Sequence, residues 1–207
     1  MRLTGLMPPF IKICGLRTPE MVAACVELSV SAVGFVFAPK SVRYIHPAEA
    51  RGLVEAIPAS IEPVGVFMNA PVDVVLAQVA AAGIGTAQLH GRYAAADIAA
   101  IEAKGVRVIR ALSVSEYLAL SGVTGRVLID GDDPGSGAEF SASLLAGVAL
   151  PSEWILAGGL TPQNVARRLR ELAPTGVDVS SGVESSRGVK SAELIEQFVA
   201  AARRSHE

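Results

Sequence analysis

The stretch Glu153–Val165, EWILAGGLTPQNV, contains the local signals that decide the fold. Its apolar run ends in the pair Gly158–Gly159, and Thr161–Pro162 follows, a combination typical of a helix start. An apolar run, a glycine turn and a helix start in that order indicate one strand–helix unit of an α/β protein. The same order recurs along the rest of the chain.

Other short apolar runs have the length and composition of buried strands. The eight candidates are Phe10–Cys14, Ala32–Phe37, Ile61–Phe67, Gly85–His90, Arg107–Leu112, Arg126–Asp130, Glu153–Gly158 and Gly176–Ser181. Prolines predict helix starts between them, because a first helical turn does not use the missing N–H; they are Pro19, Pro47, Pro71 and Pro162. The helices after Leu112 and Asp130 have the weakest patterns, and GDDPGSGAEF (131–140) is interpreted as a loop.

Eight such units in 207 residues predict a single-domain (β/α)8 TIM barrel over 1–207, with 1–9 as a short N-terminal extension. A doubly wound open sheet is the alternative, but it would place a GxGxxG turn after the first strand, where none occurs. The glycine turns instead follow the seventh and eighth strands, at Gly158–Gly159 and Ser180–Gly182. Barrels bind phosphate at that position through backbone N–H groups, so the turns favour the barrel.

Composition excludes several classes of function. The formal net charge of -2 provides no basic surface for nucleic acid or an anionic membrane. No uncharged apolar run reaches the roughly 18 residues of a membrane span, and the first 15 residues lack the apolar core of a signal peptide. Two cysteines without a CxxC or a His/Cys cluster predict neither a disulfide framework nor a metal site. We therefore expect a cytoplasmic protein with reduced thiols.

Two residues at the carboxyl ends of predicted strands are candidates for chemistry, because these ends face the active site of a barrel. Cys14 is either a small packing residue or a reagent, and the helix start at Thr18–Pro19 would lower the pKa of its thiol. Asp130 ends an apolar run, where poor solvation would raise the pKa of its carboxyl, although a turn or capping aspartate is the alternative. Cys25, on an alanine-rich helix, is assigned to packing.

Other polar residues suit binding or pairing. Arg43 lies in the loop after the second strand, and its planar guanidinium suits a carboxylate. His90 shares one face of its strand with Gln88 and either orients a substrate or has a hydrogen-bonded structural role. Lys12 and Asp178 both point inward by strand parity, and closure of the barrel makes their strands neighbours. We predict that these two form a buried ion pair.

Six motifs occur in a recognisable order: KICGLRTPE, GFVF with KSVRYI, QLHG, VLID with PGSG, LAGGLTPQNV and VDVSSGVESSRGVK. Together they resemble the phosphoribosylanthranilate isomerase family of tryptophan biosynthesis over nearly the whole chain. The resemblance implies an isomerase that converts N-(5-phosphoribosyl)anthranilate to 1-(2-carboxyphenylamino)-1-deoxyribulose 5-phosphate by an Amadori rearrangement. It implies no redox step and no metal, so we expect no cofactor.

The resemblance also implies roles for individual residues. Cys14 matches the general base of the family, Asp130 the general acid, and Arg43 the arginine that holds the anthranilate carboxylate. We add His90 as a substrate-binding residue, and the residues that match the phosphate site are Gly158, Gly159, Ser181 and Gly182. We expect a small phosphorylated substrate as the only ligand, and a monomer or homodimer.

The chain departs from the family pattern at a few positions. Arg92 follows QLHG where acidic residues are usual, and Ser141–Ala142 follow Phe140 where Asp-Trp is common. A related barrel isomerase of histidine synthesis is the nearest alternative, but it uses two aspartates and a second phosphate turn in its first half. A non-catalytic binder of phosphorylated ligands is the other alternative, and the presence of both Cys14 and Asp130 argues against it.

Overall fold

The computed structural model describes residues 8–120, 123–131, 145 and 147–204. Its barrel strands are β1 (Phe10–Cys14), β2 (Ala32–Val36), β3 (Glu62–Met68), β4 (Thr86–His90), β5 (Arg107–Ser113), β6 (Arg126–Asp130), β7 (Trp154–Leu156) and β8 (Gly176–Val179). The α-helices are α1 (Pro19–Glu27), α2 (Pro47–Val54), α3 (Val72–Ala82), α4 (Ala95–Glu102), α5 (Val114–Ala119), α6 (Val165–Leu172) and α7 (Ala192–Arg204). After β8 come the short 3-10 helix η2 (Ser181–Val183) and a hairpin of β9 (Glu184–Ser186) and β10 (Val189–Lys190).

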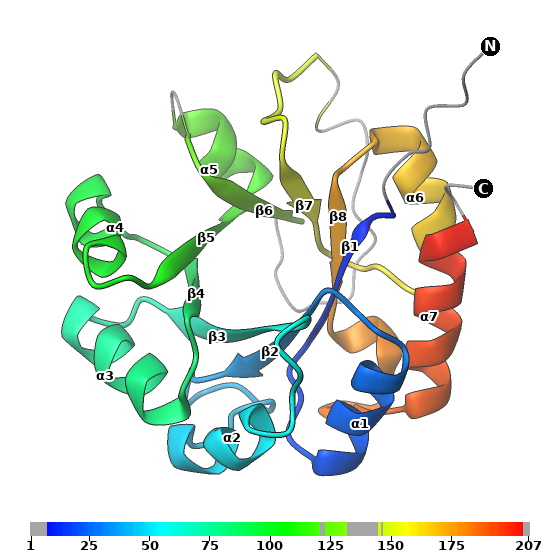
Figure 1. The fold of residues 1–207 in the computed structure, drawn as a ribbon. Helices are drawn as coiled ribbons and strands as arrows, with labels where there is room; N and C mark the ends of the chain where they lie inside the picture. Colours follow the sequence, from blue (N-terminus) through cyan, green and yellow to red (C-terminus); the bar gives the residue numbers. More distant parts are fainter. Residues whose placement is uncertain (1–7, 121–122, 132–144, 146, 205–207) are drawn as a thin grey trace.

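The eight strands β1 to β8 pair in sequence order and in parallel, and β8 pairs with β1 to close a barrel. Figure 1 shows this barrel with the helices outside it. All eight strands lie where the apolar runs predicted them, so the barrel is confirmed and the doubly wound open sheet is wrong. At the closing pair, Lys12 of β1 is in register with Asp178 of β8.

The core has an outer and an inner part. The outer part fills the space between strands and helices with outward-facing strand residues such as Ile11 and Ile13 and helix residues such as Phe198. Small and branched side chains form the inner part, including Ala32, Val64 and Leu128. Because strand side chains alternate in direction, every second residue of a strand points into the barrel. That alternation places Lys12 and Cys14 inside.

The predicted helix starts agree with the structure at two of the four prolines. Pro19 and Pro47 are the first residues of α1 and α2, and Pro71 caps α3 from one position earlier. The start predicted at Pro162 is wrong, because α6 begins at Val165. Asn164 holds the preceding residues in a turn instead: its Oδ1 accepts from Thr161 N, and its Nδ2 donates to Gly159 O.

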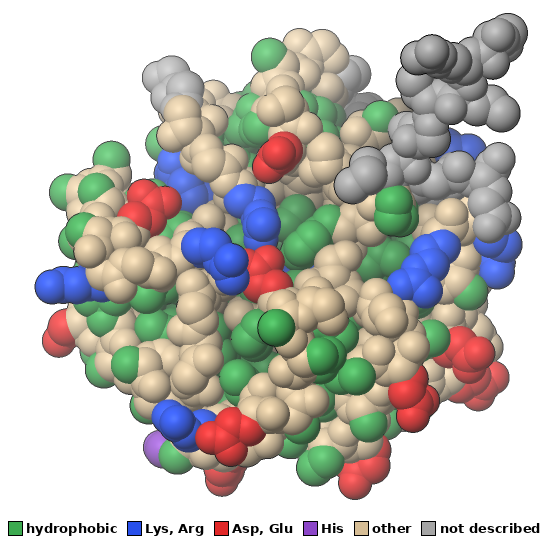
Figure 2. Space-filling view, viewed as in Figure 1, with side chains coloured by type: hydrophobic (Ala, Val, Ile, Leu, Met, Phe, Trp, Pro, Cys, Tyr) green, Lys and Arg blue, Asp and Glu red, His purple; other side chains and the backbone are tan. Residues whose placement is uncertain are grey.

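Several sequence-based expectations lie wholly or mostly outside the described residues. They concern the extension over 1–9, the loop GDDPGSGAEF and the unusual Ser141–Ala142. Within the part that the structure describes, no helix has the length and apolar character needed to cross a membrane. Figure 2 shows basic and acidic side chains interspersed over one face, in keeping with a formal net charge of -2.

Candidate active site

The carboxyl ends of the strands gather the predicted reactive residues at one end of the barrel. A cavity of about 450 Å³ lies there, lined by residues that include His90 from β4, Ser113 from β5 and Asp130 from β6. Cys14 ends β1, three strands from β6 around the closed barrel. The fold therefore brings both candidate proton-transfer residues to the same end, as strand order predicts.

Cys14 is only 6% exposed, and glycine on the neighbouring strand makes room for its thiol. A Cβ atom at Gly34 would lie 2.9 Å from Cys14 Sγ and 3.1 Å from Lys12 Nζ, so thiol and ammonium share one small space. Burial raises the pKa of the Cys14 thiol above its usual value, and the Lys12 ammonium only partly opposes this. The expectation that a helix start lowers this pKa is wrong, because α1 begins five residues later and burial dominates.

Lys12 and Asp178 form the ion pair that strand parity predicted. Lys12 Nζ lies 2.9 Å from Asp178 Oδ1, and the lysine side chain is 0% exposed. Burial alone would lower the pKa of Lys12, but the Asp178 carboxylate and the Cys14 thiol raise it above its usual value. The pair therefore keeps the ammonium of Lys12 charged beside Cys14, while the Asp178 carboxylate acts on the pKa of the thiol in the opposite direction. The predicted pair is confirmed.

Asp130 ends β6 in an environment that disfavours its charged form. Burial raises the pKa of its carboxyl to about 6, and the negative charge of Asp178 adds to this shift. Gly131 N donates to Asp130 Oδ1 at 2.8 Å, and no lysine or arginine among the described residues pairs with it. A Cβ at Gly158 would lie 2.7 Å from the same oxygen, so this glycine makes room for the carboxyl group. The predicted rise in pKa is confirmed.

His90 is neutral and is held by a residue of its own strand. Burial lowers the pKa of His90 to about 4, and the Lys12 charge acts in the same direction. The Gln88 side-chain amide lies 2.7 Å from His90 Nε2, within hydrogen-bond distance. This contact fixes the ring at the carboxyl end of β4, where a neutral imidazole can hydrogen-bond to a substrate.

Arg43 already holds a carboxylate of the protein. Its Nε lies 2.6 Å from Glu184 Oε1 and its Nη2 lies 2.9 Å from Glu184 Oε2. Lys190 Nζ lies 2.7 Å from Glu184 Oε1. Gly15, with φ of 82°, lies beneath the arginine, and a Cβ there would be 2.8 Å from Arg43 Cδ. Arg43 is therefore fixed over the residue that follows Cys14.

The two late glycine turns touch each other. Gly158 and Gly159 have φ of 89° and 61°, values that favour glycine. A Cβ at Gly182 would overlap the carbonyl oxygen of Leu160, so the turn after β8 packs directly on the turn after β7. Ser181 begins η2 beside them. The residues predicted to bind phosphate thus form one continuous backbone surface.

Glu184 and Lys190 were not among the predicted site residues. The signal was present in the motif ESSRGVK (184–190), where opposite charges flank a turn that contains Gly188. Such a pattern is typical of a hairpin, and β9 and β10 place Lys190 opposite Glu184. The sequence did not indicate that these two charged groups are buried. The Lys190 side chain is only 3% exposed and that of Glu184 only 4%.

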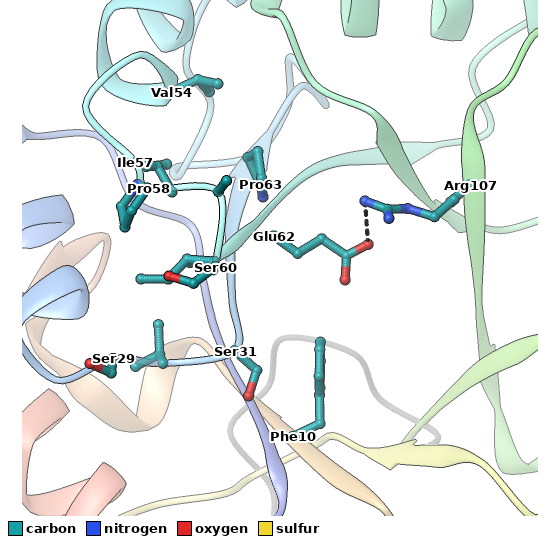
Figure 3. Close-up of a pocket in the computed structure, with 13 residues that line it drawn as sticks. Phe10, Ser29, Ser31, Val54, Ile57, Pro58, Ser60, Glu62, Pro63 and Arg107 are labelled. Carbon is teal, nitrogen blue, oxygen red and sulfur yellow. Dashed lines mark ion pairs between the residues drawn. The ribbon is translucent and has the colours of Figure 1, made fainter.

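A second cavity, of about 570 Å³, lies at the amino ends of the strands (Figure 3). The Glu62 carboxylate in this cavity accepts hydrogen bonds from Thr86 Oγ1 and Arg126 Nη1 and pairs with Arg107 Nη2 at 3.1 Å. Arg126 also lies over the Phe10 ring, 5.2 Å from its centroid. Every charged group named here has a partner, as expected of a face that serves stability.

Comparison with known proteins places the chain among isomerases. The family profile described as "N-(5'phosphoribosyl)anthranilate (PRA) isomerase" matches residues 11–201. The N-(5'-phosphoribosyl)anthranilate isomerase of Paracoccus denitrificans is 40% identical over 209 residues, which cover 93% of this chain and 96% of that protein. A phosphoribosyl anthranilate isomerase crystallised with reduced 1-(o-carboxyphenylamino)-1-deoxyribulose 5-phosphate is 33% identical, with a TM-score of 0.86 over 96% of this chain and 100% of that one. A monomeric form of the dimeric isomerase of Thermotoga maritima is 34% identical, with a TM-score of 0.82 over 95% and 98%.

Proposed function

The chain belongs to the N-(5'-phosphoribosyl)anthranilate isomerase family and catalyses that isomerisation in tryptophan biosynthesis, and we propose that Asp130 and Cys14 carry out its two proton transfers. The observation that carries the proposal is their shared position at the carboxyl ends of β6 and β1. Cys14 is buried and Asp130 is half-buried, and burial raises the pKa of each above its usual value. Perturbed groups of this kind in a barrel mouth suit acid and base roles.

Asp130 acts first, as the general acid. Its protonated carboxyl gives a proton to the ribose ring oxygen while the bond from that oxygen to C1′ breaks. The lone pair of the anthranilate nitrogen forms the C=N bond of a Schiff base, so the charge balances. A pKa of about 6 keeps a useful fraction of Asp130 protonated near neutral pH.

Cys14 acts second, as the general base. Its thiolate takes the proton from C2′, the electron pair of that bond forms C1′=C2′, and the C=N electrons return to nitrogen. The resulting enolamine tautomerises to the C2′ ketone. The buried Lys12 ammonium lies beside the thiol and stabilises the thiolate during this step.

The two pKa directions define which protonation state reacts. Because the Cys14 pKa lies above its usual value and that of Asp130 is about 6, the resting pair at pH 7 is mainly thiol and carboxylate. The reactive pair of thiolate and carboxylic acid is a minor population. The rate therefore has a plateau between the two pKa values of the pair and falls outside them.

Substrate binding divides between the two charged ends of the ligand. Arg43 holds the anthranilate carboxylate, and His90 hydrogen-bonds to the substrate. Gly158, Gly159, Ser181 and Gly182 bind the phosphate through the adjoining turns after β7 and β8. A relative was crystallised with reduced 1-(o-carboxyphenylamino)-1-deoxyribulose 5-phosphate, a ligand with both a carboxylate and a phosphate, which supports a site that binds both groups.

We also propose a cytoplasmic monomer or homodimer. Cys14 and Cys25 are both free thiols, and a reducing compartment keeps the proposed base reduced. The Thermotoga maritima relative is described as dimeric, which supports a homodimer as one of the two states. Light scattering after gel filtration distinguishes the two.

Replacement of the thiol tests the proposed roles. Loss of phosphoribosylanthranilate fluorescence measures turnover, and Cys14→Ser should lower kcat by about 10²–10⁴-fold, because a hydroxyl is a far weaker acid than a thiol. Cys14→Asp should recover part of the activity. Cys25→Ala is the control: Cys25 is buried in α1, burial raises its pKa to about 12, and its loss should leave turnover unchanged. Near-normal turnover by Cys14→Ser would exclude the thiol as the base.

A further inference from the structure

The contact between Arg43 and Glu184 bears on how the substrate carboxylate is recognised. A guanidinium has five N–H donors, arranged as a side pair on Nε and one Nη and an end pair shared by the two Nη atoms. Glu184 occupies the side pair, with distances of 2.6 Å to Nε and 2.9 Å to Nη2. Among the residues that the structure describes, no acceptor contacts the end pair of donors, which leaves this pair for a second carboxylate. Two carboxylates can therefore bind Arg43 at once.

We propose that Glu184 is a positioning residue that holds Arg43 side-on and aims its end pair of donors at the anthranilate carboxylate. This inference rests on the proposed role of Arg43. The Arg43 side chain is 15% exposed, whereas that of Glu184 is 4% exposed. The guanidinium is therefore the more accessible of the two groups, and its carboxylate partner is the more deeply buried.

Glu184 is itself held on several sides. Lys190 Nζ lies 2.7 Å from its Oε1, and Gly188 N donates to its Oε2 at 2.9 Å. Lys190 also donates to Ser180 O at 2.8 Å, and the Ser180 hydroxyl donates to the backbone oxygen of Cys14 at 3.1 Å. The β9–β10 hairpin is thereby tied to the strand that carries the proposed base. These contacts fix the position of Arg43 relative to Cys14.

The charges in this cluster match the expected ligand. Arg43 and Lys190 are cations and Glu184 is an anion, so the three together carry one net positive charge for one substrate carboxylate. Without Glu184, Arg43 and Lys190 would repel each other and the arginine would lose its orientation. Gly15 adds a steric restraint, because a Cβ there would lie 2.8 Å from Arg43 Cδ.

The test uses two stable ligands that differ only in the carboxylate. One is the reduced product, 1-(2-carboxyphenylamino)-1-deoxyribitol 5-phosphate, and the other is its analogue with a plain phenyl ring. The ratio of their dissociation constants measures recognition of the carboxylate. Arg43→Ala should lower this ratio, which tests the proposed role of Arg43. Glu184→Gln should lower it on the order of 10-fold and raise KM with a smaller change in kcat, the mark of lost uniform binding.

A double-mutant cycle separates positioning from a structural role. In an Arg43→Ala background, Glu184→Gln should change the ratio no further, because there is no guanidinium left to orient. Glu184→Gln with Lys190→Met keeps the net charge of the cluster and removes the orientation, so it should still lower the ratio. This charge-balanced variant also replaces Glu184→Gln if the single variant fails to fold. Glu55→Gln, which breaks the exposed Arg51–Glu55 pair, is the matched control and should change nothing.

The outcomes are distinct. If Arg43→Ala lowers the ratio and neither Glu184 variant does, the inference is wrong and the role of Arg43 stands. Equal weakening of both ligands by Glu184→Gln, in both backgrounds, would assign Glu184 a structural role and overturn the inference. An unchanged ratio in Arg43→Ala would overturn the role of Arg43 together with the inference.

Discussion

Asp130 and Glu62 are carboxylates at opposite ends of the same barrel, and their surroundings are opposite as well. Asp130, at the carboxyl end of β6, accepts a hydrogen bond from Gly131 N and has no cationic partner among the described residues. Glu62, at the amino end of β3, is bound by Thr86, Arg107 and Arg126. Burial raises the pKa of Asp130 to about 6, whereas the partners of Glu62 outweigh its burial and lower its pKa below the usual value.

The difference indicates that residues for the reaction and residues for stability lie at opposite ends of the barrel. A carboxylate whose oxygens are paired with hydrogen-bond donors and cations has a lowered pKa, stays ionised and is a poor proton donor. A carboxylate that is buried with few partners gives up its proton near neutral pH, at a cost to the folded state. The amino face carries the first kind and the carboxyl face the second. Variants at the two ends should therefore change different measurements.

The largest contrast should appear in turnover. Asp130→Asn keeps the shape of the side chain but removes its proton, so kcat should fall by about 10²–10⁴-fold. Glu62→Gln, at the other end, should leave kcat within about twofold. The fluorescence assay on both variants checks this. A comparable loss of turnover in the two would end the distinction between the faces.

The next effect concerns the ion pair that lies between the two ends. Lys12→Met leaves Asp178 charged and buried without its partner, which should cost about 3–5 kcal/mol of unfolding free energy. Lys12→Met with Asp178→Asn should recover most of that loss, because no stranded charge remains. Urea unfolding measures both. A loss below about 1 kcal/mol in the single variant would contradict the buried geometry of 2.9 Å.

The pH dependence of stability should have opposite signs at the two carboxylates. The pKa of Asp130 is raised from 3.8 to about 6, so its contribution is fully present below pH 3.8 and is lost as the pH rises through 6. Relative to Asp130→Asn, the wild-type chain should lose on the order of 2–3 kcal/mol of stability between pH 3.5 and 8. Unfolding of both proteins across this range measures the difference, and a constant difference would contradict the raised pKa.

Glu62 should show the smallest effect and the reverse slope. Its pKa is lowered, so its contribution is present above the usual value of 4.5 and is lost as the pH falls through the folded-state value. Glu62→Gln should cost about 1–2 kcal/mol at pH 7, limited because the Arg107 side chain is 68% exposed. Glu55→Gln, at an exposed pair, should cost less than about 0.5 kcal/mol. If both variants lose the same unfolding free energy, Glu62 contributes no more to stability than an exposed ion pair.

Local chemical rules account for what could be predicted before the structure. Apolar runs located all eight strands, and prolines located α1 and α2, because strand burial and first-turn geometry depend on neighbouring residues. The Lys12–Asp178 pair could be predicted because side chains alternate in direction along a strand and the first and last strands of a closed barrel are neighbours. Both rules need only the order of residues and strands. The start of α6 was missed because the side chain of Asn164 competes with a local helix signal.

The chain order therefore specified the barrel, the position of Cys14 and Asp130 at strand ends, and the family. The sign of the Cys14 pKa shift did not follow from it, because burial is a sum over atoms from many elements and exceeded the one local influence considered. The pairing of Arg43 with Glu184 also had no local signal, since 141 residues separate them. Contacts of that range exist only once the barrel has closed, because closure places β1 between β2 and β8 and brings the loops after β2 and β8 together.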